Sequence, residues 1–503
     1  MSELRTVTHW IAGRPDDGPS ERVGDVYDPA TGEVQARVAF ASEADVDRAV
    51  QAALEAQPGW GETSLTRRAE VLFAFRQLLM DHVEELAGII SSEHGKVRFD
   101  AMGEIRAGID VLEFACGIPH LLKGEFSENV STNIDTYSIR QPVGVAAGIT
   151  PFNFPMMVPM WMVPIALACG NAFVLKPSEK DPSASLLLAR LLRDAGLPDG
   201  VFNVVHGDKV AVDALLTHPK VDAVSSVGST PVARYIYATA SANGKRVQSL
   251  GGAKNHMVVL PDCDMDLAAD SAVNAGYGST GQRCMAVSAV VAVGAAGDPL
   301  IDRVRERLAV LRVGPGSDPN AQMGPLVTPE ARDRVVSAIE AGVHAGATLA
   351  VDGRDLKVEG HENGFFVGPT VFDHVTPEMS IYRDEIFGPV LVVVRVDRLE
   401  DAISLINANP YGNGTAIFTS DGGAARMFQH EVQVGMVGIN VPIPVPLPFY
   451  SFGGWKASLF GPLHMYGPDG VAFFTRGKVV TTRWPDPAAR GVDLGFPGAN
   501  RST

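Results

Sequence analysis

Residues 278–284, Gly-Ser-Thr-Gly-Gln-Arg-Cys, place a single cysteine at the end of a small polar run, directly after an arginine. A thiolate is a far stronger nucleophile than a thiol, and an adjacent positive charge lowers the pKa of a cysteine. Gly278 and Gly281 allow positive φ angles or a close approach to a ligand. The run predicts that Cys284 is a nucleophile; the alternative is a free cysteine that fills core space.

Length, charge and cysteine usage restrict the class of protein. A chain of 503 residues is longer than a single hydrophobic core usually organises, so two or more domains are expected. A formal net charge of −16 argues against nucleic acids and anionic membranes as partners. Four cysteines without a CxxC pair or a His-rich cluster favour a reducing compartment and predict no metal site. The first residues show no secretory or organellar presequence, so a cytoplasmic location is expected.

Short apolar or β-branched runs alternate with helical periodicity along most of the chain. The predicted strands are Val143–Ile149, Ala172–Leu175, Phe202–Val205, Ala223–Val227 and His256–Leu260 in a first region, and Ala289–Val293, Val390–Val396, Thr415–Thr419 and Met436–Asn440 in a second. Helices are predicted from a capping-box-like start at Ser42 and over 65–93, 98–122, 298–311 and 329–345. This alternation predicts βαβ units and an α/β fold with two parallel-sheet domains.

Three further segments have distinctive patterns. Ser127–Gln141 and Gly477–Arg483 alternate apolar and polar residues, which predicts a protruding hairpin. The apolar stretch Phe154–Leu175 is interrupted by prolines, so it reads as a buried turn and helix rather than a membrane span. Val441–Pro448 carries four prolines and must be extended.

Several motifs occur in the order and approximate spacing of the aldehyde dehydrogenase superfamily. They are Thr150–Pro155, Lys176–Glu179, Gly228–Thr230, Cys284 and Glu385–Pro389. The resemblance runs from about residue 8 to 485. Within the superfamily, residues 252–256, 281–285 and the Pro-rich loop before Tyr450 resemble the CoA-acylating methylmalonate-semialdehyde dehydrogenases.

The resemblance implies an arrangement of domains. An NAD-binding domain is expected over 1–124 and 143–255, and a catalytic domain over 256–445. An oligomerisation element is expected over 125–142 and 470–490, in a homodimer or homotetramer. The fold class is therefore predicted to be α/β, with two parallel-sheet domains and a small β hairpin.

The resemblance also assigns the reacting groups. Cys284 resembles the nucleophile that attacks the aldehyde, and Asn153 resembles the oxyanion donor, together with the Cys284 backbone N–H. Hydride transfer to NAD then leaves a Cys284 thioester. The alternative for Asn153 is a turn residue between two aromatic side chains.

Ten residues are expected to bind the cofactor: Thr150, Phe152, Lys176, Glu179, Lys180, Gly228, Ser229, Leu250, Glu385 and Phe387. Lys176 and Glu179 follow a predicted strand, where they can meet the adenosine ribose. A carboxylate at Glu179 would repel a 2′-phosphate, which favours NAD over NADP. Gly228 and Ser229 precede a helical run, where a pyrophosphate can bind. Alone, each could be a solvated charge or a core residue.

One departure from the hydrolytic members bears on the reaction. Their deacylating glutamate aligns with Leu250, in the run 249–254. Leucine cannot accept a proton, and general base catalysis is worth about 10²–10⁴-fold. Attack by water on the thioester should be slow, so coenzyme A is expected as the acyl acceptor. Two alternatives remain: a hydrolytic semialdehyde dehydrogenase in which another carboxylate activates the water, and a non-catalytic NAD-binding protein.

Two arginines are expected to bind a substrate carboxylate, Arg106 and Arg283, because guanidinium groups pair with carboxylates through two parallel hydrogen bonds. Arg106 could instead form a surface pair with Asp110, and Arg283 could support the loop. The predicted reaction is the NAD-dependent, CoA-acylating oxidative decarboxylation of methylmalonate or malonate semialdehyde to propionyl-CoA or acetyl-CoA, CO2 and NADH. Trp455 departs from the family pattern and could affect acyl size or the approach of CoA.

Overall fold

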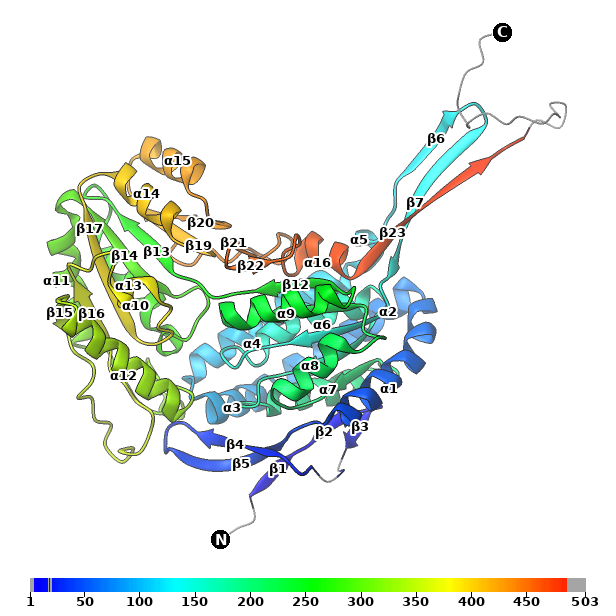
Figure 1. The fold of residues 1–503 in the computed structure, drawn as a ribbon, viewed down its shortest axis with the longest axis horizontal. Coiled ribbons are helices and arrows are strands. Elements are labelled where there is room, and N and C mark those ends of the chain that lie inside the picture. The colour runs from blue at the N-terminus through cyan, green and yellow to red at the C-terminus, as the bar shows by residue number, and fades with distance from the viewer. Residues whose placement is uncertain (1–3, 17, 19, 486–503) are drawn as a thin grey trace.

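Two mainly parallel sheets organise the computed structural model, which describes residues 4–16, 18 and 20–485 (Figure 1). The first sheet has eight strands in the order β22 (Leu459–Phe460), β12 (Arg246–Leu250), β11 (Ala223–Val227), β8 (Val145–Ile149), β9 (Ala172–Lys176), β10 (Phe202–Val204), β2 (His9–Ile11) and β3 (Arg14–Asp16). The five strands from β12 to β10 are parallel, and the edge strands β22, β2 and β3 are antiparallel.

Helices cover both faces of the first sheet. They are α1 (Glu43–Glu62), α2 (Leu65–Asp81), α3 (Val83–His94), α4 (Arg98–Cys116), α5 (Ile118–Leu121), α6 (Met157–Ala168), α7 (Ser183–Asp194), α8 (Lys209–Thr217) and α9 (Thr230–Ala242). Ala146 and Phe173 pack with α2, α4, α6 and α7, whereas Ala147 and Val174 pack with α1, α8 and α9. Successive residues of one strand thus pack into apolar clusters on opposite faces of the sheet, as expected for strands that are buried on both faces.

The second sheet has seven strands and its own helices. Its order is β15 (Thr348–Val351), β16 (Thr370–Asp373), β17 (Val390–Val396), β14 (Val287–Val293), β13 (Asn255–Val259), β19 (Gly414–Phe418) and β20 (Met436–Ile439). The helices of this region are α10 (Met265–Tyr277), α11 (Gly297–Leu308), α12 (Pro329–His344), α13 (Ser380–Arg383), α14 (Leu399–Ala408) and α15 (Gly422–Glu431), with short 3-10 turns at Gly278–Gly281 and Gly294–Ala296. Only β15 pairs antiparallel within this sheet.

A three-stranded antiparallel sheet projects away from both regions (Figure 1). It consists of β6 (Phe126–Ser131), β7 (Ile134–Pro142) and β23 (Thr475–Arg483). Its large exposed apolar side chains, with Trp484 just after it, are Phe126, Val130, Tyr137, Ile139 and Val479. Residues 486–490 of the expected oligomerisation element lie outside the described part of the chain.

The α/β class and two parallel-sheet regions predicted from the sequence are confirmed, with several differences in detail. The predicted helix 65–93 breaks at His82 into α2 and α3. The N-terminal strands were not predicted: besides β2 and β3 they are β1 (Arg5–Val7), β4 (Val23–Asp28) and β5 (Glu33–Ala39), which form a three-stranded sheet. After β20 the chain returns through β21 (Trp455–Lys456), which pairs with β18 (Tyr411–Gly412), to β22 and then α16 (Gly467–Phe473).

Strand β12 was missed because its buried side chains are partly polar. Gln248 accepts a hydrogen bond from the Ser225 hydroxyl at 2.8 Å, and the hydroxyls of Ser249 and Ser226 are 2.6 Å apart. Neighbouring strands therefore satisfy these groups, and the apolar run that marks a buried strand is not needed. The stretch around α6 is buried as expected. Among the helices that the structure describes, none is both long and apolar enough to cross a bilayer.

Candidate active site

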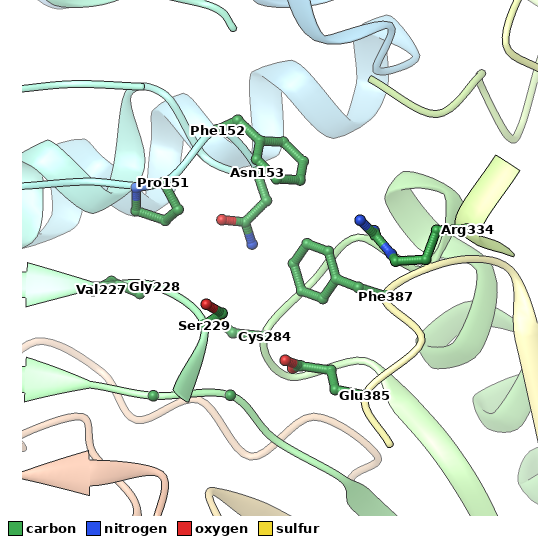
Figure 2. A pocket seen from close by; sticks show the side chains of 12 residues that line it. Pro151, Phe152, Asn153, Val227, Gly228, Ser229, Cys284, Arg334, Glu385 and Phe387 are labelled. Carbon is green, nitrogen blue, oxygen red and sulfur yellow. The ribbon is translucent and has the colours of Figure 1, made fainter. Parts of the chain in front are cut away.

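A cleft of about 310 Å³ lies between loops of the two large sheets, and Figure 2 shows the residues that line it. The carboxyl ends of parallel strands are where open α/β sheets place ligands, and β8, β11 and β12 all end here. Loops that precede β14 and β17 supply the opposite wall. The lining residues are Pro151, Phe152, Asn153, Val227, Gly228, Ser229, Gly251, Gly252, Cys284, Arg334, Glu385 and Phe387.

The loop before Cys284 has an unusual backbone. Ser279, Thr280 and Gly281 all have positive φ angles, of 50°, 56° and 69°. Non-glycine residues in this region cost of order 1–3 kcal/mol each and persist only where the surroundings hold them. The Ser279 N–H donates to Asp100 Oδ2 at 2.8 Å, and the Thr280 hydroxyl donates to a backbone carbonyl at 2.8 Å.

Only one of the two glycines in this run has a positive φ angle. Gly281 has the positive φ angle, whereas Gly278 has φ −55°. A side chain at Gly278 would instead meet the Arg283 guanidinium carbon at 2.5 Å. Gly278 therefore gives room to Arg283, and the conformational strain falls on Ser279 and Thr280.

Cys284 is half-buried and opens into the cleft (Figure 2). Its carbonyl accepts hydrogen bonds from the side-chain amides of Asn255 at 2.8 Å and Asn413 at 3.2 Å. Burial raises the pKa of its thiol to about 12, and the carboxylate of Glu385 acts in the same direction. The N–H groups of Cys284 and Met285 oppose this rise. In this ligand-free structure the group is a thiol at neutral pH.

The inference that Arg283 lowers the pKa of the neighbouring thiol is wrong. Its guanidinium donates to Asp100 Oδ1 at 2.7 Å. The charge of Arg283 is thereby neutralised, and the pKa of Cys284 lies above its ordinary value. Arg283 and Cys284 lie in a turn, in which the Ala286 N–H donates to the Arg283 carbonyl at 3.0 Å, and a carboxylate from a distant helix engages the guanidinium. Arg283 lines a smaller cavity that Cys284 also lines.

The structure places Arg106 outside the cleft lining. It lies on α4, where its Nε is 3.0 Å from Asp110 Oδ1, and 58% of its side chain is exposed. This is the i,i+4 surface pair that the sequence offered as the alternative. Trp455 is likewise exposed and does not line the cleft.

Asn153 is buried, and its side-chain amide points into the cleft (Figure 2). Its backbone carbonyl accepts a hydrogen bond from Lys96 Nζ at 2.6 Å. The neighbouring Phe152 contacts Phe387 edge to face, with ring centroids 5.9 Å apart, and Lys180 Nζ lies 4.5 Å from the Phe152 ring centroid. The cleft wall from the first sheet and the wall from the second sheet therefore contact each other through the rings of Phe152 and Phe387.

The end of β11 and the start of α9 meet at the cleft. Gly228 and Ser229 line the cleft, and Ser229 makes no side-chain bond to the first turn of the thirteen-residue helix α9. The N–H groups of that turn and the positive end of the helix dipole are suited to a phosphate. The hydroxyl of Thr230 accepts from the Gly252 N–H at 2.8 Å. A side chain at Gly251 would meet the Ala457 carbonyl at 2.5 Å, which explains the glycine there.

The other predicted cofactor residues lie away from the cleft lining: Thr150, Lys176, Glu179, Lys180 and Leu250. Lys176 Nζ is 3.2 Å from Glu179 Oε2 at the end of β9. Burial raises the pKa of Glu179, but Lys176 and a backbone N–H outweigh burial and the pKa is lowered. Thr150 is buried, and Leu250 packs in the apolar cluster against which Cys284 also lies.

Glu385 is the one carboxylate among the cleft-lining residues that the structure describes. Its Oε1 accepts the Ala253 N–H at 2.9 Å, and burial raises its pKa although Lys254 opposes this. Lys254 donates to two backbone carbonyls, at 2.7 and 2.9 Å, and burial lowers its pKa to about 8. Glu385 is thus held by the backbone that follows β12.

Sequence reasoning missed several residues that build this site. Arg334 on α12 lines the cleft beside Phe387 (Figure 2), and it belongs to no motif. Asn255 and Asp100 hold the backbone at and before Cys284, and Lys96 holds that of Asn153. Asn255 lies within a quoted motif, so a signal was present; Lys96 and Asp100 are ordinary charges on or before a helix.

The chain is similar to known dehydrogenases over nearly its whole length. Residues 16–480 match the model of the aldehyde dehydrogenase family. The chain is 55% identical to a malonate-semialdehyde dehydrogenase of Pseudomonas aeruginosa, over 98% of this chain and 100% of that protein. It is 49% identical to the acylating, mitochondrial methylmalonate-semialdehyde dehydrogenase of Arabidopsis thaliana, over 98% of this chain and 81% of that protein.

The fold is similar to that of a Sinorhizobium meliloti protein assigned to the methylmalonate-semialdehyde dehydrogenases and crystallised with NAD. The TM-score is 0.96 at 56% sequence identity, and the match covers 97% of this chain and 100% of the other. The fold predicted from the resemblance is therefore confirmed.

The raised pKa of Cys284 predicts how its reactivity depends on pH. Below its pKa, the thiolate fraction of a cysteine rises about tenfold per pH unit. Alkylation of Cys284 by iodoacetamide in the ligand-free protein should therefore rise steadily from pH 7 to 9, measured by mass spectrometry of the modified peptide, with Cys284→Ser as the blank. A rate that levels off below pH 9 would show that a nearby positive charge does lower the pKa.

Proposed function

The chain belongs to the aldehyde dehydrogenase family, and from that premise we propose that it oxidises malonate or methylmalonate semialdehyde with NAD and passes the acyl group to coenzyme A. The products are acetyl-CoA or propionyl-CoA, CO2 and NADH. The observation that carries the choice of acceptor is Leu250, which is apolar and buried where hydrolytic members hold a glutamate. The names of the relatives support the same substrates.

Cys284 begins the reaction by attack on the aldehyde carbon. The thiol loses its proton to solvent, its sulfur forms a bond to that carbon, and the carbonyl oxygen becomes an oxyanion that the Asn153 amide and the Cys284 N–H stabilise by donating hydrogen bonds. Collapse of the oxyanion expels a hydride and leaves a thioester on Cys284. NAD, when bound, supplies the hydride acceptor.

Water has little access to a base at this thioester. Glu385 is the candidate carboxylate on the cleft wall, and its Oε1 is already bonded to the Ala253 N–H. The thiol of coenzyme A is a better nucleophile and attacks the thioester carbon, which releases the Cys284 thiolate. The β-carboxylate of the acyl group leaves as CO2 through a thioester-stabilised enolate.

The residues present fit a dinucleotide. Gly228 and Ser229 offer the first turn of α9 to the pyrophosphate. Lys176 and Glu179, paired at the end of β9, suit the adenosine ribose, and the carboxylate favours NAD over NADP. Glu385 and Phe387 reach the nicotinamide side of the cleft. Thr150, Phe152, Lys180 and Leu250 complete the proposed surroundings, and NAD is present in the S. meliloti structure.

Substrate recognition is assigned to Arg106 and Arg283. The Arg106–Asp110 pair lies at the surface, where ion pairs are worth about 0–1 kcal/mol, so a substrate carboxylate can replace Asp110. Arg283 is held by Asp100 and lines the small cavity beside Cys284.

The projecting sheet and the cysteines suggest assembly and location. The exposed apolar side chains of β6, β7 and β23 suit contact with a second copy, in a homodimer or homotetramer. All four cysteines are free, which suits a reducing cytoplasm.

The acyl acceptor is tested by NADH formation with saturating NAD, with and without CoA. Both semialdehydes should give a burst that becomes steady turnover only when CoA is present, because the thioester otherwise persists. Equal steady rates in both conditions would identify water as the acceptor and favour a hydrolytic enzyme. The absence of NADH from both substrates would contradict the proposed substrates.

The role of Arg106 is tested with Arg106→Met. Loss of a charged hydrogen-bonding partner should raise KM for malonate semialdehyde about 10–100-fold, and KM for propanal, which has no carboxylate, should stay unchanged. Asp110→Asn is the matched control, because it removes the ion pair and keeps the guanidinium. An unchanged KM for the semialdehyde in R106M would leave Arg106 as a surface residue.

The assembly surface is tested with Val479→Asp on β23. Val479 is 69% exposed, and a buried charge at a subunit contact is unfavourable. Analytical ultracentrifugation should show smaller species than the wild type. Val310→Asp is the control, because Val310 is 74% exposed and lies outside the projecting sheet. A monomeric wild type would contradict the proposed oligomer.

A further inference from the structure

Helix α4 contacts both of the loops that carry the reacting groups. Asp100 and Glu104 are four residues apart on this helix and so lie on one face. Asp100 bonds to the loop before Cys284, and Glu104 bonds to the loop after Asn153. Neither residue lines the cleft.

Asp100 makes three polar contacts with the nucleophile loop. Its Oδ2 accepts the Ser279 N–H at 2.8 Å and the Ser279 hydroxyl at 3.2 Å, and its Oδ1 accepts from the Arg283 guanidinium at 2.7 Å. Only 12% of its side chain is exposed. These bonds hold the loop at Ser279, which is the first of its positive-φ residues and lies five positions before Cys284, and at Arg283, directly beside Cys284.

Glu104 holds the second loop together with Lys96. The two side chains are fully buried and 2.6 Å apart. The other oxygen of Glu104 accepts the N–H groups of Met156 and Met157 at 2.8 and 3.1 Å, and Lys96 Nζ donates to the Asn153 carbonyl at 2.6 Å. The ion pair therefore holds the backbone by hydrogen bonds at Asn153 and again at Met156, three residues later.

These contacts bear on the distance between Asn153 and Cys284. Asn153 follows β8 in the first sheet, and Cys284 precedes β14 in the second, so no shared strand determines the distance between them. We propose that Asp100 and Glu104 are positioning residues that set the Cys284 loop and the Asn153 loop against one helix face. This rests on the roles of Cys284 and Asn153 in the proposed function. A misplacement of about 1 Å can cost about 10²-fold in rate.

When two residues affect the rate through the same geometry, the rate losses caused by replacing them are not independent. Once either loop is displaced, releasing the other removes little more, so the losses should not multiply. Two residues with separate structural roles would instead give independent losses, whose product is about 10⁴-fold. This difference distinguishes a positioning role from general support of the fold.

The test uses the full protein and p-nitrophenyl acetate, an activated ester. The Cys284 thiolate attacks the acetyl carbon, the oxyanion meets the Asn153 amide, and p-nitrophenolate leaves to give acetyl-Cys284. The assay needs neither NAD nor a semialdehyde. Asp100→Asn, Glu104→Gln and the double variant are compared with Glu113→Gln as control. Glu113 is also on α4, where it pairs with Arg76 at 2.8 Å.

The burst amplitude counts folded, acylable sites, and the burst rate reports their geometry. Each single variant should keep the amplitude and lose about 10²-fold in rate, the double variant should match the slower single, and Glu113→Gln should match the wild type. A single variant at the wild-type rate, or a double variant with multiplied losses, would overturn the proposal.

Glu104→Gln leaves the charge of Lys96 buried and unpaired, which can prevent folding. If its amplitude falls, Lys96→Met/Glu104→Met replaces it, because both charges are then removed and the volume is kept. The burst amplitude and rate of this replacement are then compared with those of Asp100→Asn in the same way. A wild type that is acylated by the ester but makes no NADH from either semialdehyde would contradict the proposed substrates and leave this test valid.

Discussion

Cys284 and Asn153, the proposed nucleophile and the proposed oxyanion donor, come from different sheets, and the rest of the site depends on how the two sheets are placed relative to each other. The carboxyl ends of β8, β11 and β12 meet the loops that precede β14 and β17. The first sheet thereby contributes Asn153 and the start of α9, and the second contributes Cys284 and Glu385. A small rotation between the sheets would separate groups that must act within hydrogen-bonding distance.

Charges around the cleft are almost all neutralised by specific partners. Arg283 is paired with Asp100, Lys96 with Glu104, and Lys254 is held by backbone carbonyls. Buried charges are tolerated only when paired and hydrogen-bonded in this way. Burial raises the pKa of the Cys284 thiol, and the carboxylate of Glu385 acts in the same direction. In the ligand-free protein Cys284 is therefore held in its less reactive thiol form.

The groups around Cys284 also bear on the proposed acyl transfer. Leu250 belongs to the apolar cluster against which Cys284 packs, and Glu385 is bonded to the backbone after β12. In the proposed function, the lack of a base at position 250 makes a thioester slow to react with water and leaves it open to a stronger nucleophile such as a thiol.

The amino-acid sequence by itself determined the α/β class and most of the strands, and it singled out Cys284, Asn153 and Leu250 as the residues on which the proposed function rests, because each of these inferences depends on local periodicity or on residue type. It did not determine where side chains point. Arg283 turns to Asp100, 183 residues earlier, and Lys96 reaches the carbonyl of Asn153 across 57 residues. Strand β12 was hidden for the same reason, since Ser225 on the neighbouring strand satisfies the polar side chain of Gln248. Only the tertiary structure decided these contacts, because hydrogen bonds between distant segments leave no periodic trace in the chain.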